Sequence, residues 1–123
     1  MSNDRLAFPQ VALLFAYAGG MAGGQLLFKA AALRYAAEAP LGERLLSLVQ
    51  NAYFVAAIAL YVALTVLWVW ILTFTPLSRA YPFVALAFAV TPLLGGYVFG
   101  EAITTRLMLG IGFILCGLLL VAG

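Results

Sequence analysis

An amide and an ammonium group stand one helical turn apart in an apolar stretch of this sequence, on Gln25 and Lys29. Residues four positions apart lie on the same face of a helix, so both groups could contact one ligand. A lysine at the centre of a membrane helix costs about 2.5 to 3.5 kcal/mol, so its ammonium either reaches the membrane interface or meets a partner. Cations and amide donors in an apolar setting favour an anionic, hydroxyl-bearing ligand.

The composition around these two residues is that of an integral membrane protein. Of 123 residues, 67% are hydrophobic and 8% are charged, whereas a soluble domain carries about 25% charged residues. Four stretches contain no charge, and each is long enough for the ~20 residues that cross a bilayer as a helix. They cover residues 6–28, 45–78, 80–100 and 107–123. None of them shows the apolar–polar alternation of a membrane barrel strand.

These stretches predict an all-α integral membrane protein, a bundle of four transmembrane helices in a single domain, 1–123, that works as a dimer. The expected helices are about 9–32, 52–74, 79–99 and 105–122. The connection over 33–50 is polar, and its leucines are spaced so that a short helix could lie on the membrane surface.

The distribution of arginines leaves the membrane orientation open. Four spans would bring Lys29, Arg34, Arg44, Glu101 and Arg106 to one side of the membrane and Arg5 and Arg79 to the other. Lys29 is left out of the count of cations, as a candidate for burial. The positive-inside rule favours the first side as cytoplasmic, but three cations against two do not fix it. Dual insertion, with an antiparallel dimer, stays open.

The residue types present do not indicate a metal site, a cofactor or nucleic-acid binding. The chain has no histidine, one cysteine and four carboxylates, from which no metal set or nucleophile–base constellation can be drawn. A net charge of +2 without a basic cluster argues against nucleic acid as a partner. We therefore expect no enzyme, no metal and no cofactor.

Glycines and one proline are candidates for helix packing and bending. Gly19 with Gly23, and Gly20 with Gly24, form two overlapping small-xxx-small pairs, which permit close approach of another helix. Gly110 and Gly117 are seven residues apart and fall on nearly one face, as expected of a helix-packing or dimer seam. Pro92 removes a backbone hydrogen bond inside the third span, where we expect a kink that could serve as a hinge.

Three local patterns together resemble the four-helix members of the drug/metabolite transporter superfamily. The first is Gly-Gln-Leu-Leu-Phe-Lys-Ala at 24–30, and the second is Pro-Leu-Ser-Arg-Ala-Tyr-Pro-Phe at 76–83. The third is Gly-Glu at 100–101, followed by Gly110 and Gly117. Their order and spacing cover nearly the whole chain apart from the first connection.

Two branches of that superfamily compete in the resemblance. The small multidrug resistance exporters are similar in length, in the lysine that closes the first helix and in the glycine spacing of the fourth. They depend on a glutamate eight residues before that lysine, where this sequence has Met21. The Gly-Gln-x-x-x-Lys and Ala-Tyr-Pro patterns look closer to small flippase subunits for aminoarabinose linked to undecaprenyl phosphate and to EamA-like proteins.

The resemblance implies that the chain moves a polyprenyl-phosphate-linked sugar, or a similar anionic lipid, between leaflets of the bacterial inner membrane. Its partners would be membrane lipid and a second subunit, in a homodimer or a heterodimer with a paralogue. The candidate substrate-binding residues are Gln25, Lys29, Arg79, Tyr81 and Glu101. Arg79 could anchor at the lipid headgroups or bind a phosphate beside the start of the third helix, and Tyr81 or a tryptophan would lie against the sugar ring.

Two other functions remain open at this level. The chain could export small cations or metabolites, with Glu101 as the coupling carboxylate in place of the missing one. Glu101 is equally explained by an ion pair with Arg106 or by a favourable charge near the start of the fourth helix. The chain could also be a non-transporting subunit of a membrane complex.

Overall fold

The computed structural model describes residues 8–35 and 37–122, and all of its regular elements are helical. The long helices are α1 (Phe8–Ala32), α3 (Ala52–Leu72), α5 (Val84–Phe99) and α6 (Thr105–Ala122). The short ones are α2 (Leu41–Gln50), α4 (Leu77–Ala80) and the 3-10 turn η1 (Tyr81–Phe83). The expected all-α fold is confirmed. Arg5, one of the residues used for the membrane orientation, lies outside the described residues.

Three segments of the described chain are long and apolar enough to cross a membrane: Phe8–Ala32, Ala52–Leu72 and Leu77–Phe99. The fourth apolar helix is shorter, over Thr105–Val121. At 1.5 Å per residue, it covers about 26 Å, slightly less than the ~30 Å of a typical hydrocarbon core. The sequence therefore yields three clear membrane spans and one shorter candidate.

The third span is not one continuous α-helix. It begins at Leu77 as α4, passes through η1 and continues as α5. Pro82 lies within the 3-10 turn, where its missing N–H and fixed φ are tolerated at the start of a helical segment. Pro92 lies inside α5, as its position in the sequence implied.

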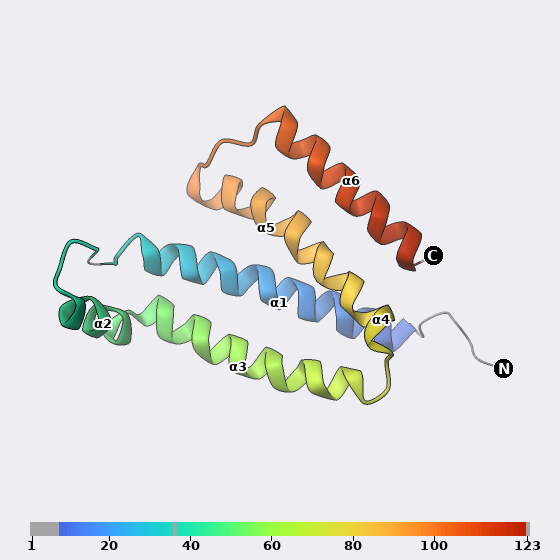
Figure 1. Cartoon of the computed structure of the whole chain (residues 1–123), viewed down its shortest axis with the longest axis horizontal. Coiled ribbons are helices and arrows are strands. Elements are labelled where there is room, and N and C mark those ends of the chain that lie inside the picture. The colour runs from blue at the N-terminus through green and yellow to red at the C-terminus, as the bar shows by residue number, and fades with distance from the viewer. Residues whose placement is uncertain (1–7, 36, 123) are drawn as a thin grey trace.

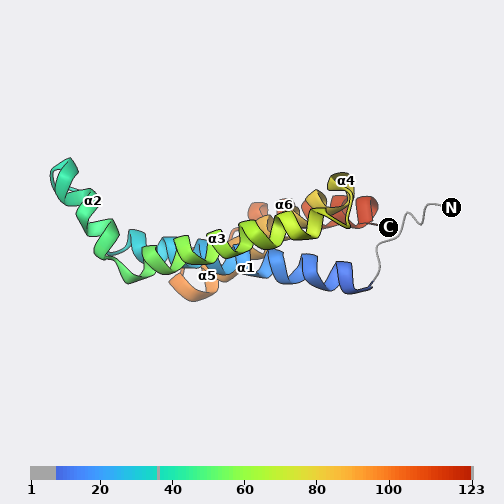
Figure 2. The same ribbon diagram turned by 90° about the horizontal axis from the view of Figure 1, so that it is seen from below.

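The long helices form an open layer rather than a closed bundle. Figure 1 shows them in the order α3, α1, α5, α6, with α1 packed against α3 on one side and α5 on the other, and with α6 packed on α5. Seen along the layer, the row is thin, and α2 leaves it at one end (Figure 2). One chain therefore leaves both faces of the layer open to lipid or to a partner.

The glycines of α1 lie on two different faces of the helix. An added Cβ at Gly20 would lie 2.8 Å from Cδ2 of Leu64, and one at Gly24 would collide with the Tyr61 ring. An added Cβ at Gly19 or Gly23 would meet nothing within 4 Å. Gly20 and Gly24 thus let α3 approach, whereas the Gly19–Gly23 pair points away from it.

Polar side chains fix the antiparallel register of α1 and α3 at both ends. Asn51 donates from Nδ2 to the carbonyl of Ala31 (3.0 Å), and its Oδ1 caps α3 by accepting from the backbone N–H of Tyr53 (3.0 Å). At the opposite end, Gln10 donates from Nε2 to the carbonyl of Phe74 (2.8 Å). Between these ends the contacts are mostly apolar, because unsatisfied polar groups are costly in hydrocarbon.

Gly24→Ala should destabilise the chain, and Gly23→Ala is its matched control. We expect Gly24→Ala to lower the free energy of unfolding by about 1–3 kcal/mol, because the Tyr61 ring must then shift and disturb its hydrogen bonds and its stacking on Phe28. Gly23→Ala should stay within about 0.5 kcal/mol of the wild type. Reversible unfolding of dilute protein in mixed micelles, followed by circular dichroism, measures both. Equal losses in the two variants would contradict the assignment of Gly24 to the α3 contact.

Candidate functional site

Lys29 meets a partner at the end of α1. It lies in the last turn of that helix, and its Nζ is 3.4 Å from Oε2 of Glu101. The two side chains are 42% and 52% exposed. Since Lys29 stands near a helix end and not at the centre of the span, the full cost of a mid-membrane lysine does not apply. In the described part of the chain Glu101 pairs with Lys29, and the ion pair with Arg106, one of the two alternative explanations of this glutamate, is not seen there.

Three glycines direct the Glu101 carboxylate towards α1. Helix α5 ends at Gly100, whose φ of 69° lies in the left-handed region that favours glycine. The chain then folds back along α5, and a Cβ at Gly95 would lie 3.2 Å from Oε1 of Glu101. At Gly96 a Cβ would lie 2.5 Å from the side chain of Ile103. Sequence reasoning missed the roles of Gly95 and Gly96, although the Gly-Gly pair preceding Gly-Glu was a visible signal.

Gln25 takes part in a hydrogen-bonded chain between α1 and α3. Its Nε2 donates to the Tyr61 hydroxyl (2.8 Å), which in turn donates to the carbonyl of Met21 (2.9 Å). The Tyr61 ring also stacks on Phe28, with 5.4 Å between ring centroids. Gln25 is exposed, and an amide has a second hydrogen and an oxygen with which to bind a ligand. Tyr61 was not among the predicted site residues.

A hollow of about 280 Å³ lies between α1 and α5, beside Gln25. It is lined by Met21, Gln25, Ala87, Phe88, Thr91 and Pro92. The lining is apolar apart from the Gln25 amide and the Thr91 hydroxyl, and it comes from two helices only. Met21, at the position where the resembling exporters carry a glutamate, is part of this wall, as is the predicted hinge residue Pro92.

The structure does not bring Arg79 and Tyr81 to the other three predicted residues. The Tyr81 ring packs edge-on against Trp68 (6.3 Å), which stacks on Tyr17 of α1 (4.8 Å). Tyr17 precedes Lys29 by 12 residues, or about 18 Å along the helix axis. Gln25, Lys29 and Glu101 therefore share one end of the layer, and Arg79 and Tyr81 lie towards the other.

The predicted seam glycines of α6 leave open space beside them within the described chain. A Cβ added at Gly110 or Gly117 would find no atom within 4 Å, as at Gly19 and Gly23. Their assignment to a seam between subunits stays a prediction. Within residues 8–35 and 37–122 there is no group of three or more His, Cys, Asp or Glu that could hold a metal ion.

Comparison with known proteins gives one partial match to a transporter subunit. The probable 4-amino-4-deoxy-L-arabinose-phosphoundecaprenol flippase subunit ArnE of Hamiltonella defensa is 41% identical over 54 residues, or 44% of this chain. The chain spans about half the length of this curated relative, 49%. No protein-family model and no solved structure matches the chain.

The relative is named as a flippase subunit and not as an enzyme. Its similarity supports a small transporter-type membrane protein, in agreement with the resemblance of the motifs to the drug/metabolite transporter superfamily. Together with the apolar helices, it indicates a multi-pass membrane protein.

Exchanging the charges of Lys29 and Glu101 tests their pairing. Lys29→Glu and Glu101→Lys each place like charges together and should lower the unfolding midpoint, whereas the double variant should restore it. The coupling free energy should be at most about 1 kcal/mol, since both side chains are exposed. Arg106→Glu combined with Glu101→Lys is the control and should show no coupling. A stronger coupling of Glu101 to Arg106 than to Lys29 would overturn the pairing.

Proposed function

We propose that this chain is one subunit of a flippase that moves a polyprenyl-phosphate-linked sugar, or a similar anionic lipid, between the leaflets of the bacterial inner membrane. The observation that carries the proposal is that Gln25 lines the hollow between α1 and α5 and that Lys29 lies one helical turn beyond it, in the last turn of α1. Met21 in the wall of that hollow offers no carboxylate to a cation. The partial similarity to a flippase subunit supports the same direction.

The Lys29–Glu101 ion pair suggests how an anionic head group would be accepted. A phosphate that reaches the end of α1 competes with the Glu101 carboxylate for the Lys29 ammonium. The two side chains are about half exposed, so breaking their contact costs little. In the empty protein, Glu101 keeps the ammonium paired at the edge of the hydrocarbon, where an unpaired charge is costly.

The hollow between α1 and α5 would receive the sugar. Gln25 and Thr91 supply an amide and a hydroxyl there, and Phe88 supplies an aromatic ring. Pro92 interrupts the hydrogen bonding of α5 at the same level, so bending of α5 would change the width of the hollow. The hydrocarbon chain of the lipid would stay outside the layer, in the bilayer.

A second subunit would complete this path. The hollow has walls from α1 and α5 only, and transporters commonly build their sites between two repeats. The open glycine pairs Gly19–Gly23 and Gly110–Gly117 would let a helix of the partner approach closely. The partner is either a second copy of this chain or a paralogue.

Lys29→Met should slow transport at least tenfold, and Lys29→Arg should retain most of it, because the charge on the phosphate needs a cationic partner. The measurement is leaflet exchange of a polyprenyl-phosphate-linked sugar in vesicles reconstituted with this protein. If a second subunit copurifies with the protein, it is included. Arg106→Met, which removes an exposed cation at the same end of the layer, should leave the rate unchanged. Exchange no faster than in protein-free vesicles would sink the proposal and favour a non-transporting subunit.

Glu101→Gln separates the flippase from a cation exporter. If the carboxylate competes with phosphate for Lys29, its removal should lower the half-saturating concentration of the lipid about threefold to tenfold. In a cation exporter coupled through Glu101, the same change should abolish proton-driven uptake. Loss of all transport in Glu101→Gln, with cation uptake present in the wild type, would contradict the flippase mechanism.

A further inference from the structure

Helix α2 (Leu41–Gln50) divides sharply into an apolar and a polar face. At 100° per residue, its apolar side chains fall within an arc of about 160°, and its polar side chains within the remainder. The apolar ones are Leu41, Leu45, Leu46, Leu48 and Val49, and the polar ones are Glu43, Arg44, Ser47 and Gln50. Leu41 and Val49 are 62% and 68% exposed. The chain itself therefore does not cover the apolar face.

The position of α2 between two membrane-span candidates indicates that lipid would cover that face. It follows the end of the α1 span and directly precedes the α3 span, so it stands at the level where hydrocarbon gives way to lipid headgroups. It also runs out of the plane of the helix layer (Figure 2). A short amphipathic helix at this level lies with its apolar face in the bilayer boundary.

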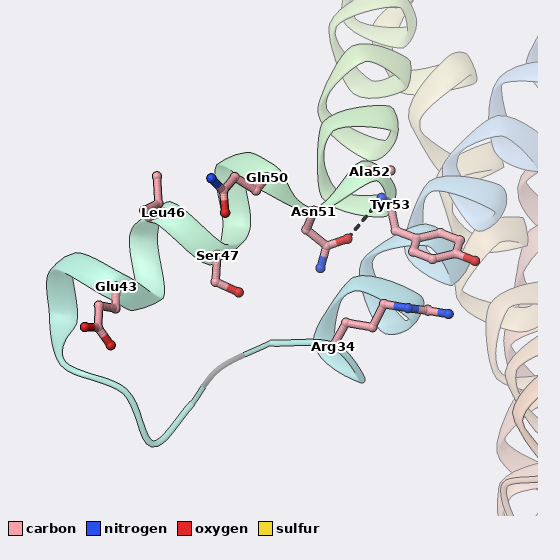
Figure 3. A pocket seen from close by; sticks show the side chains of 8 residues that line it. All are labelled: Arg34, Glu43, Leu46, Ser47, Gln50, Asn51, Ala52 and Tyr53. Carbon is pink, nitrogen blue, oxygen red and sulfur yellow. Dashed lines mark hydrogen bonds between the residues drawn. The ribbon is translucent and has the colours of Figure 1, made fainter.

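The polar face of α2 borders a second hollow, which is larger than the one between α1 and α5. It has a volume of about 470 Å³, within the range of about 300–1,000 Å³ typical of small-ligand sites. Figure 3 shows its lining, drawn from α2, from the start of α3 and from the residues that follow α1. The polar and aromatic members are Arg34, Glu43, Ser47, Gln50, Asn51 and Tyr53.

Some of these side chains are fixed by the protein, and others remain for a ligand. The Arg34 guanidinium lies 4.5 Å from the centroid of the Tyr53 ring, and Asn51 is engaged in capping α3 and bonding to Ala31. In the described part of the chain, Glu43, Ser47 and Gln50 form no side-chain hydrogen bond. The hollow thus combines a fixed cation and aromatic ring with three unengaged polar groups.

This combination suits a phosphorylated sugar better than the alternatives. A site for phosphate alone gains from several cations and loses from a carboxylate such as Glu43. An acyl chain would leave the polar groups unpaired. Sugar hydroxyls can use a carboxylate, an amide and a hydroxyl together, while the Arg34 guanidinium is suited to a phosphate oxygen.

We infer that this hollow is the surface capture site for the head group of the lipid-linked sugar, before it reaches Lys29. The inference rests on the proposed function and adds to it a second, outer site. The hollow and Lys29 lie at the same end of α1, because Arg34 follows that helix by two residues and Asn51 is bonded to Ala31. With α2 in the bilayer boundary, the head group occupies the hollow while the lipid chain remains in the membrane.

Cysteine labelling tests whether the hollow binds the head group. Ser47→Cys in a Cys116→Ser background would be alkylated by a membrane-impermeant maleimide in lipid nanodiscs, with and without polyprenyl-phosphate glucose. We expect the sugar lipid to slow labelling at least threefold, and polyprenyl phosphate alone to have less effect. Ser78→Cys, exposed on α4 towards the opposite end, is the matched control and should not respond. An unchanged rate at position 47, or equal slowing by free glucose 1-phosphate, would overturn the inference.

The position of α2 has its own test in the same nanodiscs. Val49→Cys should react at least tenfold more slowly than Ser47→Cys, although Val49 is 68% exposed in the isolated chain, because lipid would cover it. Equal rates at the two positions would show that α2 stands clear of the membrane and would overturn the capture geometry.

Measurements of lipid flipping distinguish a failure of the capture site from a failure of the proposed flippase function. Gln50→Leu should raise the half-saturating concentration of the sugar lipid several-fold with little change in the maximal rate, since capture precedes the Lys29 step. Leaflet exchange with no protection at position 47 and no effect of Gln50→Leu would sink the capture site alone. Protection at position 47 without leaflet exchange would support the capture site and sink the flippase proposal.

Discussion

The close approach of α1 and α3 at Gly20 and Gly24 is the contact on which the rest of the structure depends. Without a Cβ at Gly24, the Tyr61 ring reaches the surface of α1 and there bonds to Gln25 and to the carbonyl of Met21. Hydrocarbon offers no hydrophobic driving force between helices, so close packing and such interhelical hydrogen bonds must hold them together. This contact also orients α1, whose other side then packs on α5.

The weakness of the Lys29–Glu101 pair is consistent with a site that exchanges partners. An exposed ion pair contributes at most about 1 kcal/mol to stability, so its value to the fold is small. The geometry of the ion pair nevertheless depends on the backbone around Glu101. Gly100 has a left-handed conformation, and the chain after it folds back over Gly95 and Gly96. A carboxylate positioned in this way next to the lysine of α1 provides a replaceable counter-ion for the proposed phosphate.

The chain offers two surfaces on which a lipid-linked sugar could bind. One is the hollow between α1 and α5, which lacks walls on its remaining sides. The other is the amphipathic helix α2, which borders a polar hollow at one end of the layer. The proposed path joins the two at the end of α1, from an outer site under α2 to the inner site at Lys29 and Gln25.

Sequence alone determined that the fold is all-helical, where the membrane-spanning segments approximately lie, and that Gln25 and Lys29 share one face of a helix. These follow from hydrocarbon thickness and from the repeat of the α-helix, which are local constraints. The count of spans also put Arg79 on the opposite side of the membrane from Lys29, in agreement with the separation seen in the structure. The short helix proposed within 33–50 corresponds to α2.

Only the tertiary structure shows that Gly20 and Gly24, and not the equally spaced Gly19 and Gly23, pack against α3. The choice depends on the side chains of α3, which the spacing of the glycines does not reveal. The tertiary structure also decided that Glu101 turns to Lys29 and not to Arg106, since the direction of the chain after α5 is set by the positive φ of Gly100 and by the space above Gly95 and Gly96. It also revealed a layer in place of a closed bundle. Periodicity identifies an apolar helix but cannot say which neighbours surround it when lipid and protein are equally apolar.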